Sequence, residues 1–384
     1  MASQPAEILS AAFQRASTNP TGRIVDDSAI ISRVELVCRN LTNRAPARFL
    51  LACLLAKGDK PTLDIRKPYT AIGGAESYSG RSYDEDYIGP FITQYDLPCN
   101  STTAFLTPAF RNRNIVLTPD VNMVGRPAHL YENVLQLLTD VHTNRVSAAD
   151  LLAETIRSLL AIQQENRQRM QSLLANLKSS GDPISLSAEA IVALIEQHLK
   201  SPRASRLPVL VVASAYRTTS DYLREQALPL RSHNAADEQT GALGDVEIRL
   251  LAHEKIVTAY EMKTRRVTKP DIDLALQKIA QMNSKLDNYI FVTTEIIEQE
   301  IKEYATTMYE QYGVEVVVLD CLDFLRYFLH LFHRLRTLFL DTYQALVLSE
   351  PDSAVSQPLK EVFLALRQAA ESGAAEAITT DSDD

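Results

Sequence analysis

The sequence predicts a mixed α/β protein, in which a mixed β-sheet is flanked by helices and follows a largely helical, loop-rich N-terminal region. Residues 184–348 show helix and strand patterns in the order helix, strand, strand, helix, strand, helix, strand, which is typical of such a sheet. Hydrophobic residues make up 46% of the chain and charged residues 23%, as in folded globular proteins. The 384 residues suffice for two or three domains.

Residues 1–183 form the predicted N-terminal region. Apolar residues at spacings of three and four predict helix over 28–57 and again over 130–178. Residues 58–130 instead hold many of the glycines and prolines together with a run of tyrosines, which predicts loops with short helices. The sequence Gly-Asp-Pro at 181–183 breaks the helical pattern and indicates a domain boundary.

The second unit is predicted to begin near residue 184, with an amphipathic helix over 186–199. Residues 207–226 are ambiguous, because the sequence VLVV resembles a buried strand while the spacing of the apolar residues favours helix. Pro208 suits a first helical turn, and no helix breaker occurs before Pro229, so we predict a helix. A polar loop is expected over 232–244.

Two strands are predicted next, over 245–251 and 255–263, because side chains of alternating character point to opposite faces of a strand. The three residues between them are few enough for a hairpin. The elements that follow are a helix from Pro270, a strand over 289–293, a helix over 295–312, a strand over 314–319 and an aromatic-rich helix to about residue 348. Residues 349–384 are predicted to form a C-terminal helix and an acidic disordered tail, the tail beginning at residue 372.

The charge distribution bears on nucleic-acid binding. The net charge of −9 argues mildly against a nucleic-acid partner. However, residues 286–384 hold 18 acidic and 6 basic residues, whereas residues 201–285 hold 13 basic and 10 acidic residues. Since the local field at a cleft matters more than the total charge, the middle of the chain remains compatible with DNA.

The sequence also predicts a cytoplasmic protein without a membrane segment. The N-terminal sequence MASQPAEILSAAF lacks the features of a secretory signal, and no stretch approaches ~18 uninterrupted apolar residues. The four cysteines lie far apart with no C-x-x-C spacing, which argues against a zinc or redox motif and fits a reducing compartment. The glycines match neither the Gly-x-Gly-x-x-Gly pattern nor the Walker A pattern of phosphate-binding loops, so no nucleotide cofactor is indicated.

One group of charged residues in the predicted hairpin carries the chemical argument. Glu261 and Lys263 share one face of their strand, and the hairpin can bring Asp245 beside them. Two carboxylates a few Å apart repel each other unless a cation lies between them, and Mg²⁺ prefers hard oxygen ligands, often one or two carboxylates plus a phosphate. The Lys263 ammonium can hold an attacking water. These are the groups that metal-assisted phosphodiester hydrolysis requires.

The alternative interpretation of the same residues is a salt-bridge ladder between two surface strands, because an Asp followed by Glu-x-Lys is common by chance. The context favours the catalytic interpretation. A basic run made of Lys263, Arg265, Arg266 and Lys269 begins at the motif, where phosphates would need counter-charges.

The order of helix, Asp on a strand, Glu-x-Lys on the next strand, helix and strand resembles the PD-(D/E)xK nuclease superfamily. Gly244 stands where that pattern has its proline. The segments HNAADEQTGALGDVEI and AYEMKTRRVT resemble the SacI-type family of type II restriction endonucleases, and so does KPYTAIGGAESYSGRSYDEDYIGPFI, so that the resemblance covers roughly residues 60–280.

This resemblance implies cleavage of double-stranded DNA at a short palindrome, dependence on Mg²⁺, a homodimer, and a cognate DNA methyltransferase as functional partner. It implies that Asp245 and Glu261 are metal ligands and that Lys263 is the catalytic group that positions the water. Some members of the superfamily carry a third carboxylate on a helix, for which Glu225 is the candidate. The expected products carry a 5′-phosphate and a 3′-hydroxyl.

Several arginines are candidates for DNA contacts, because arginine pairs bidentately with guanine. Those in the N-terminal region are Arg66, Arg81 and Arg111, with Lys67 and Arg113 nearby, and those after the motif are Arg265 and Arg266. The alternative is that the N-terminal segment is an ordinary irregular subdomain. His330 and His333 form an H-x-x-H pattern that favours a structural role, since no carboxylates lie at ligand spacing.

Three functions of different kinds follow from these observations. The first is a site-specific endonuclease of the restriction type. The second is a repair or recombination nuclease of the same superfamily, which would cut according to DNA structure instead of sequence. The third is a DNA-binding or scaffold protein without catalytic activity, in which the acidic pair belongs to a salt-bridge ladder.

Overall fold

The computed structural model divides the chain into two compact units, Met1–Arg169 and Met170–Asp384. It describes residues 4–18, 20, 22–40, 43–111, 114–179, 186–230, 242–252, 255–281 and 286–381, without the side chains of 178–179 and 373–381. The predicted break at 181–183 and most of the predicted loop over 232–244 lie outside these residues. No helix in the described part of the chain is long and apolar enough to cross a membrane.

Unit 1 is a helical region with an irregular middle. Its long helices are α1 (Gln4–Thr18), α2 (Ser28–Cys38), α3 (Ala45–Asp59), α6 (Ala128–His142) and the first part of α7 (Ala148–Ser179). Between α3 and α6 the described residues form only short helical segments, as predicted for 58–130: η1 (Thr70–Ile72), α4 (Gly80–Tyr83), the π-helix η2 (Asp84–Ile88), α5 (Gly89–Tyr95) and η3 (Ala104–Leu106). The pattern over 28–57 is therefore two helices, with Pro46 in the first turn of the second.

Helix α3 lies at the centre of unit 1. Its residues from Ala45 to Ala56 are all buried, and all but Arg48 are apolar, so this part of the helix has no solvent-exposed face. The ring of Phe49 stacks on Phe110 with centroids 3.8 Å apart, and Arg48 forms a buried ion pair with Asp84 at 2.5 Å. These contacts hold the irregular middle of the unit against the helical core.

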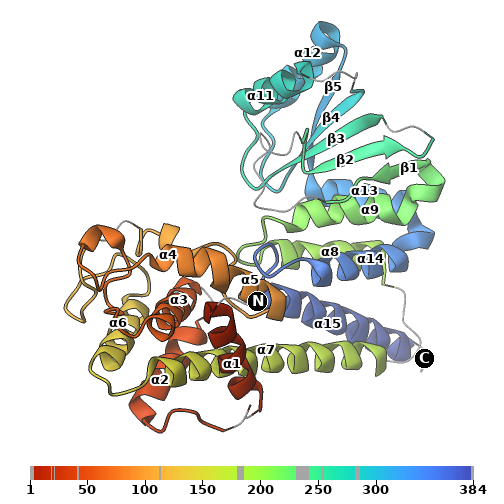
Figure 1. Cartoon of the computed structure of the whole chain (residues 1–384). Helices are drawn as coiled ribbons and strands as arrows, with labels where there is room; N and C mark the ends of the chain where they lie inside the picture. Colours follow the sequence, from red (N-terminus) through yellow and green to blue (C-terminus); the bar gives the residue numbers. More distant parts are fainter. Residues whose placement is uncertain are drawn as a thin grey trace. The chain divides into compact units, whose positions relative to one another are not determined.

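Unit 2 contains a five-stranded sheet in the order β1-β2-β3-β4-β5 (Figure 1). The strands are β1 (Glu225–Ala227), β2 (Val246–Leu250), β3 (Ile256–Lys263), β4 (Asn288–Thr293) and β5 (Glu315–Asp320). The first three pair antiparallel, whereas β3, β4 and β5 pair parallel. Strand β1, the short edge strand, was not predicted from the sequence; the other four were.

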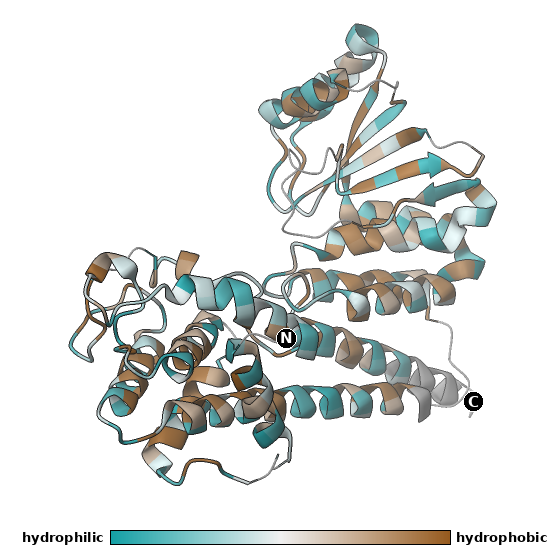
Figure 2. Ribbon diagram, in the orientation of Figure 1, coloured by the Kyte–Doolittle hydropathy of each residue, from teal (hydrophilic) through white to brown (hydrophobic). Residues whose placement is uncertain are grey.

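Helices cover both faces of this sheet, which confirms the predicted mixed sheet flanked by helices. Helices α11 (Lys269–Ala280) and α12 (Gln299–Tyr312) lie on one face, and α9 (Leu207–Leu223) and α13 (Cys321–Leu331) lie on the other (Figure 1). The first part of α9 and the central strands are rich in hydrophobic residues (brown in Figure 2). Along β3, Tyr260 packs towards α9 and Ala259 packs towards α11, so the alternation leaves Glu261 and Lys263 on the α11 side.

Three predictions about element ends were wrong. The helix predicted over 207–226 ends at Leu223, because Arg224 adopts a left-handed conformation (φ 57°), and Glu225 therefore begins β1. The aromatic-rich helix is broken into α13, η4 (His333–Leu335) and α14 (Arg336–Ser349). Helix α15 (Gln357–Asp381) includes residues 372–381, which were predicted to be disordered. Ala374, Ala375 and Ala377 in that segment have high helix propensity, which favours the continued helix.

Candidate active site

The hairpin register places Asp245 beside the end of β3. The last pair of the ladder at this end is Val246 with Tyr260, so the preceding residue, Asp245, lies opposite Glu261. The main-chain N–H of Met262 donates to Asp245 Oδ2 at 2.8 Å, which fixes the exposed carboxylate against β3. The two acidic residues of the predicted site therefore share one end of the sheet.

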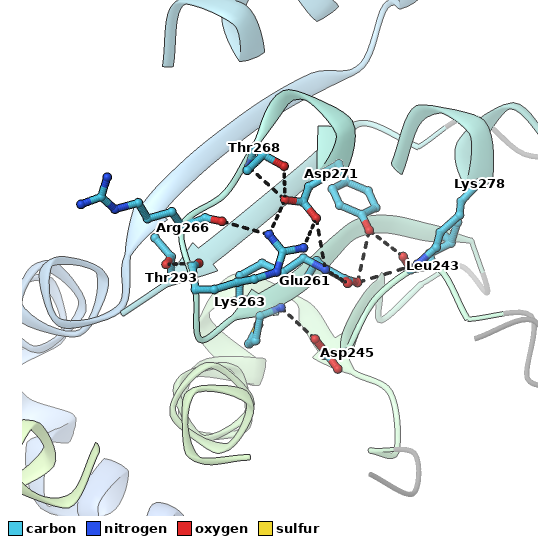
Figure 3. Close-up of polar contacts among 12 residues, drawn as sticks. Leu243, Asp245, Glu261, Lys263, Arg266, Thr268, Asp271, Lys278 and Thr293 are labelled. Atoms are coloured by element: carbon cyan, nitrogen blue, oxygen red, sulfur yellow. Dashed lines mark hydrogen bonds and ion pairs between the residues drawn. The ribbon is translucent and has the colours of Figure 1, made fainter. Parts of the chain in front are cut away.

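Glu261 lies between two lysines (Figure 3). The Nζ atom of Lys263 donates to Glu261 Oε1 at 2.8 Å, and the Nζ atom of Lys278, on α11, lies 4.0 Å from Glu261 Oε2. The Glu261 side chain is only 13% exposed and that of Lys263 only 20%. Each lysine can balance the charge of the Glu261 carboxylate.

Asp271 is a further acidic residue that sequence reasoning missed. It accepts two hydrogen bonds from Arg265, at 2.8 and 2.6 Å, and its Oδ1 lies 3.9 Å from Lys263 Nζ. It also closes a capping box with Thr268 at the start of α11. Burial alone would raise its pKa, but the hydrogen bonds from Arg265 and Thr268 and the charge of Lys263 lower it to about 2. The pattern Thr-x-x-Asp before the helix is the signal that could have found it.

The segment before Asp245 approaches β3 closely. A Cβ atom on Gly244 would overlap the main-chain carbonyl oxygen of Tyr260, so only glycine fits at this position. The N–H of Leu243 donates to Glu247 Oε1 at 2.9 Å, and the carbonyl of Leu243 accepts from the Tyr289 hydroxyl at 2.9 Å. Glu247 and Tyr289 were not predicted, although the period of two along β2 puts Glu247 on the same face as Asp245.

The structure does not bring Glu225 to this site. It lies on β1, not on a helix, and pairs with Leu250 at the other end of β2. Five residue steps of a strand, roughly 16 Å, separate that position from Asp245. Burial raises the pKa of Glu225, but its place in the sheet excludes it from the acidic pair, so the prediction of a third helix carboxylate was wrong at this residue.

Most arginines predicted to contact DNA are engaged by carboxylates. In unit 1, Arg66 pairs with Asp64 and Arg81 pairs with Glu85, while Arg111 is exposed. In unit 2, Arg266 pairs with Glu298 at 2.9 Å and Arg265 pairs with Asp271. Lys67 is paired with Glu76. Arg113 lies outside the described residues. These carboxylates balance the charge of the paired side chains and so weaken their attraction for a phosphate.

The two histidines of the H-x-x-H pattern do not lie at the site. Helix α13, which carries His330, covers the sheet face opposite α11. His330 contacts Glu189 at 3.3 Å, and His333 lies in η4. Among the residues that the structure describes, no group of three or more His, Cys, Asp or Glu side chains is arranged to hold a metal.

The donor atoms at the end of β2 and β3 nevertheless fit Mg²⁺. Asp245 and Glu261 offer hard carboxylate oxygens from neighbouring strands, and the main-chain carbonyl of Met262 lies between Glu261 and Lys263 in the sequence. Because Mg²⁺ keeps several waters and commonly takes one or two carboxylates together with a substrate phosphate, two protein carboxylates are enough. The chemistry of this donor set is therefore compatible with a magnesium ion.

One comparison with known proteins coincides with these residues. Residues 184–295 match the SacI restriction endonuclease C-terminal domain. The match covers α8 (Ala188–Leu199), α9, strands β1 to β4 and α11, and so includes Asp245, Glu261 and Lys263. It supports a restriction endonuclease similar to SacI. No curated protein matches the sequence. The resemblance of residues 60–183 to the same family lies outside the match and stays a prediction.

Proposed function

We propose that this protein is a type II restriction endonuclease that hydrolyses phosphodiester bonds of double-stranded DNA with Mg²⁺ at a specific site. The observation that carries the proposal is the placement of Asp245 against Met262 N–H, beside the Glu261–Lys263 pair. These residues lie within the segment that matches the SacI restriction endonuclease C-terminal domain.

The protein groups have distinct tasks in this proposal. The carboxylates of Asp245 and Glu261, with the Met262 carbonyl, would hold Mg²⁺, which when bound supplies charge stabilisation at the scissile phosphate. Lys263, 2.8 Å from Glu261, orients the attacking water in line with the leaving 3′-oxygen. Cleavage of the bond between phosphorus and the 3′-oxygen leaves a 5′-phosphate and a 3′-hydroxyl. Arg265 and Thr268 hold Asp271 in place behind Lys263.

The connectivity of unit 2 supports assignment to the PD-(D/E)xK superfamily. Helix α9 is followed by three antiparallel strands, then by α11 and by β4, which joins β3 in parallel. The acidic residues fall on the second and third strands and the lysine two positions after the second acidic residue. This is the arrangement that the sequence resemblance implies for a superfamily core.

The proposal extends to the partners and the compartment. A palindromic DNA site has two-fold symmetry, so an enzyme that cuts both strands at equivalent positions is expected to act as a homodimer. An active enzyme of this kind requires a DNA methyltransferase that protects the host genome, and both proteins would work in the cytoplasm.

The test is digestion of phage DNA by the purified full-length protein. We expect discrete fragments with Mg²⁺ and intact DNA with EDTA. Cleavage of branched DNA alone would favour a structure-specific repair nuclease. Intact DNA under all metal conditions, with the folded protein still bound to DNA, would favour a non-catalytic binding protein.

A further inference from the structure

Two buried side chains hold the segment that carries Asp245 by binding the main-chain N–H and the main-chain carbonyl of one residue, Leu243. The Leu243 N–H donates to Glu247 Oε1 at 2.9 Å, and the Tyr289 hydroxyl donates to the Leu243 carbonyl at 2.9 Å. Glu247 is 5% exposed and Tyr289 only 1%. A hydrogen bond in such surroundings is protected from exchange with water, so both bonds constrain Leu243 strongly.

The same tyrosine connects this segment to the second acidic residue. The Tyr289 hydroxyl lies 3.4 Å from Glu261 Oε2, and Tyr289 stands on β4, opposite Ala259 of β3. One side chain from the neighbouring strand therefore reaches both the main chain two residues before Asp245 and the carboxylate of Glu261. Figure 3 shows Leu243 and Glu261 near each other, with Asp245 below them.

Gly244 completes the constraint. With no Cβ, it lets the chain between Leu243 and Asp245 lie directly on the Tyr260 carbonyl. Because Leu243 is fixed at its N–H and its carbonyl, and Gly244 is fixed by close approach, the main chain that precedes Asp245 has little freedom. The Asp245 carboxylate then meets Met262 N–H in one geometry.

We infer that Tyr289 and Glu247 are positioning residues that set the distance between the two metal-binding carboxylates. This inference rests on the proposed function, because it assigns a task to residues around the proposed magnesium site. Neither residue touches the reacting atoms. Tyr289 acts through Leu243 and Glu261, and Glu247 acts through Leu243. Their loss should weaken metal binding and slow the chemical step without weakening DNA binding.

Tyr289→Phe tests the inference, because it removes the hydroxyl and keeps the ring that packs in the core. Tyr343→Phe is the matched control. Tyr343 is also fully buried in unit 2 and also loses a hydrogen bond, to His198 at 3.0 Å, but it packs in the other core. A second pair of variants, at Glu247, distinguishes loss of the hydrogen bond to Leu243 from a general loss of stability. Glu247→Gln keeps an acceptor for the Leu243 N–H, whereas Glu247→Leu removes it.

Two quantities are measured. The first is Mn²⁺ binding, which is monitored through the electron paramagnetic resonance signal of the free ion. The second is the Mg²⁺ dependence of DNA cleavage. For Tyr289→Phe and Glu247→Leu we expect the half-saturating metal concentration to rise several-fold and kcat to fall about 10- to 100-fold, as for a small displacement of catalytic groups. The KM for DNA should not change. Tyr343→Phe and Glu247→Gln should resemble the wild type.

If Tyr289→Phe matches Tyr343→Phe in metal dependence and kcat while the wild type cuts DNA, the positioning role is wrong and the proposed function stands. If Glu247→Leu does not fold, the comparison of the two tyrosine variants still decides the matter. If the wild type neither binds Mn²⁺ nor cuts DNA, the proposed function itself fails.

Discussion

The Nζ atom of Lys263 lies 2.8 Å from Oε1 of Glu261, so the proposed water-positioning group and a proposed metal ligand form one ion pair (Figure 3). Both side chains are largely buried, at 20% and 13% exposure, which strengthens their attraction relative to a pair in water. The pair makes each partner's role depend on the other, and this dependence guides the first prediction.

Replacing either member of the pair is expected to abolish most cleavage. Lys263→Met should lower kcat by roughly 10²- to 10⁴-fold, the range for a lost proton-transfer or water-positioning group. Glu261→Gln, which keeps the shape but removes the charge, should lose activity to a similar extent. Both variants should bind DNA in Ca²⁺ as the wild type does. The measurement is single-turnover cleavage, and DNA binding in the presence of Ca²⁺ is the control for folding.

The Arg265–Asp271 pair is expected to support Lys263 from behind. Arg265→Leu leaves the Asp271 carboxylate with Thr268 and Lys263, so Lys263 should shift towards Asp271 and away from Glu261. We expect kcat to fall at constant KM for DNA. Arg266→Leu is the matched control, because Arg266 is the neighbouring arginine and pairs with Glu298, outside this cluster. Equal activity of the two variants would contradict the supporting role.

Gly244→Ala is expected to be both destabilising and inactive. The added methyl group would overlap the Tyr260 carbonyl oxygen, so the start of β2 must separate from β3. Overpacking of this kind costs about 1–3 kcal/mol, which urea unfolding of unit 2 would detect. Gly73→Ala is an informative contrast, because space is open around a Cβ there and only its left-handed backbone (φ 79°) opposes the change. A fully active Gly244→Ala protein would show that the close approach is unimportant.

The stability of unit 2 is expected to fall between pH 6.5 and about pH 4. Burial lowers the pKa of His198 to about 4, while its Nδ1 contacts Tyr343 and its Nε2 contacts the Leu359 carbonyl. The unfolded chain, with an ordinary histidine pKa, takes up the proton first as pH falls. Stability from this group is thus complete above pH 6.5 and lost as pH approaches 4, by about 3 kcal/mol at most.

The check is urea unfolding at several pH values, with His198→Asn as the comparison. The part of the pH dependence that belongs to this histidine should disappear in the variant. If the free energy of unfolding changes with pH equally in the wild type and the variant between pH 6.5 and 4, the buried histidine is not the source of the pH dependence.

Local patterns in the sequence predicted the order of most elements in unit 2 and the approach of Asp245 to Glu261. Period-two alternation in β2 and β3 and the short connection between them were sufficient for that. The same patterns could not separate the end of α9 from β1, because Glu225–Ala227 is too short to show alternation. A left-handed residue at Arg224, which the sequence does not signal, decides where the helix ends.

The supporting residues were beyond local patterns for a different reason. Tyr289 reaches Leu243 only because β4 lies beside β3, and Lys278 reaches Glu261 only because α11 covers that face. Such contacts depend on tertiary structure. The ion pairs of Arg66 with Asp64 and of Arg81 with Glu85 are different, because they join residues only two and four positions apart and their partners are visible in the sequence.

The most direct test of the central claim is to sequence both ends of every fragment that the full-length protein produces from phage DNA in Mg²⁺. We predict that all ends derive from one short palindrome, carry a 5′-phosphate, and vanish when Glu261 is replaced by Gln. Ends scattered over unrelated sequences, or identical ends produced by the Glu261→Gln protein, would contradict the account.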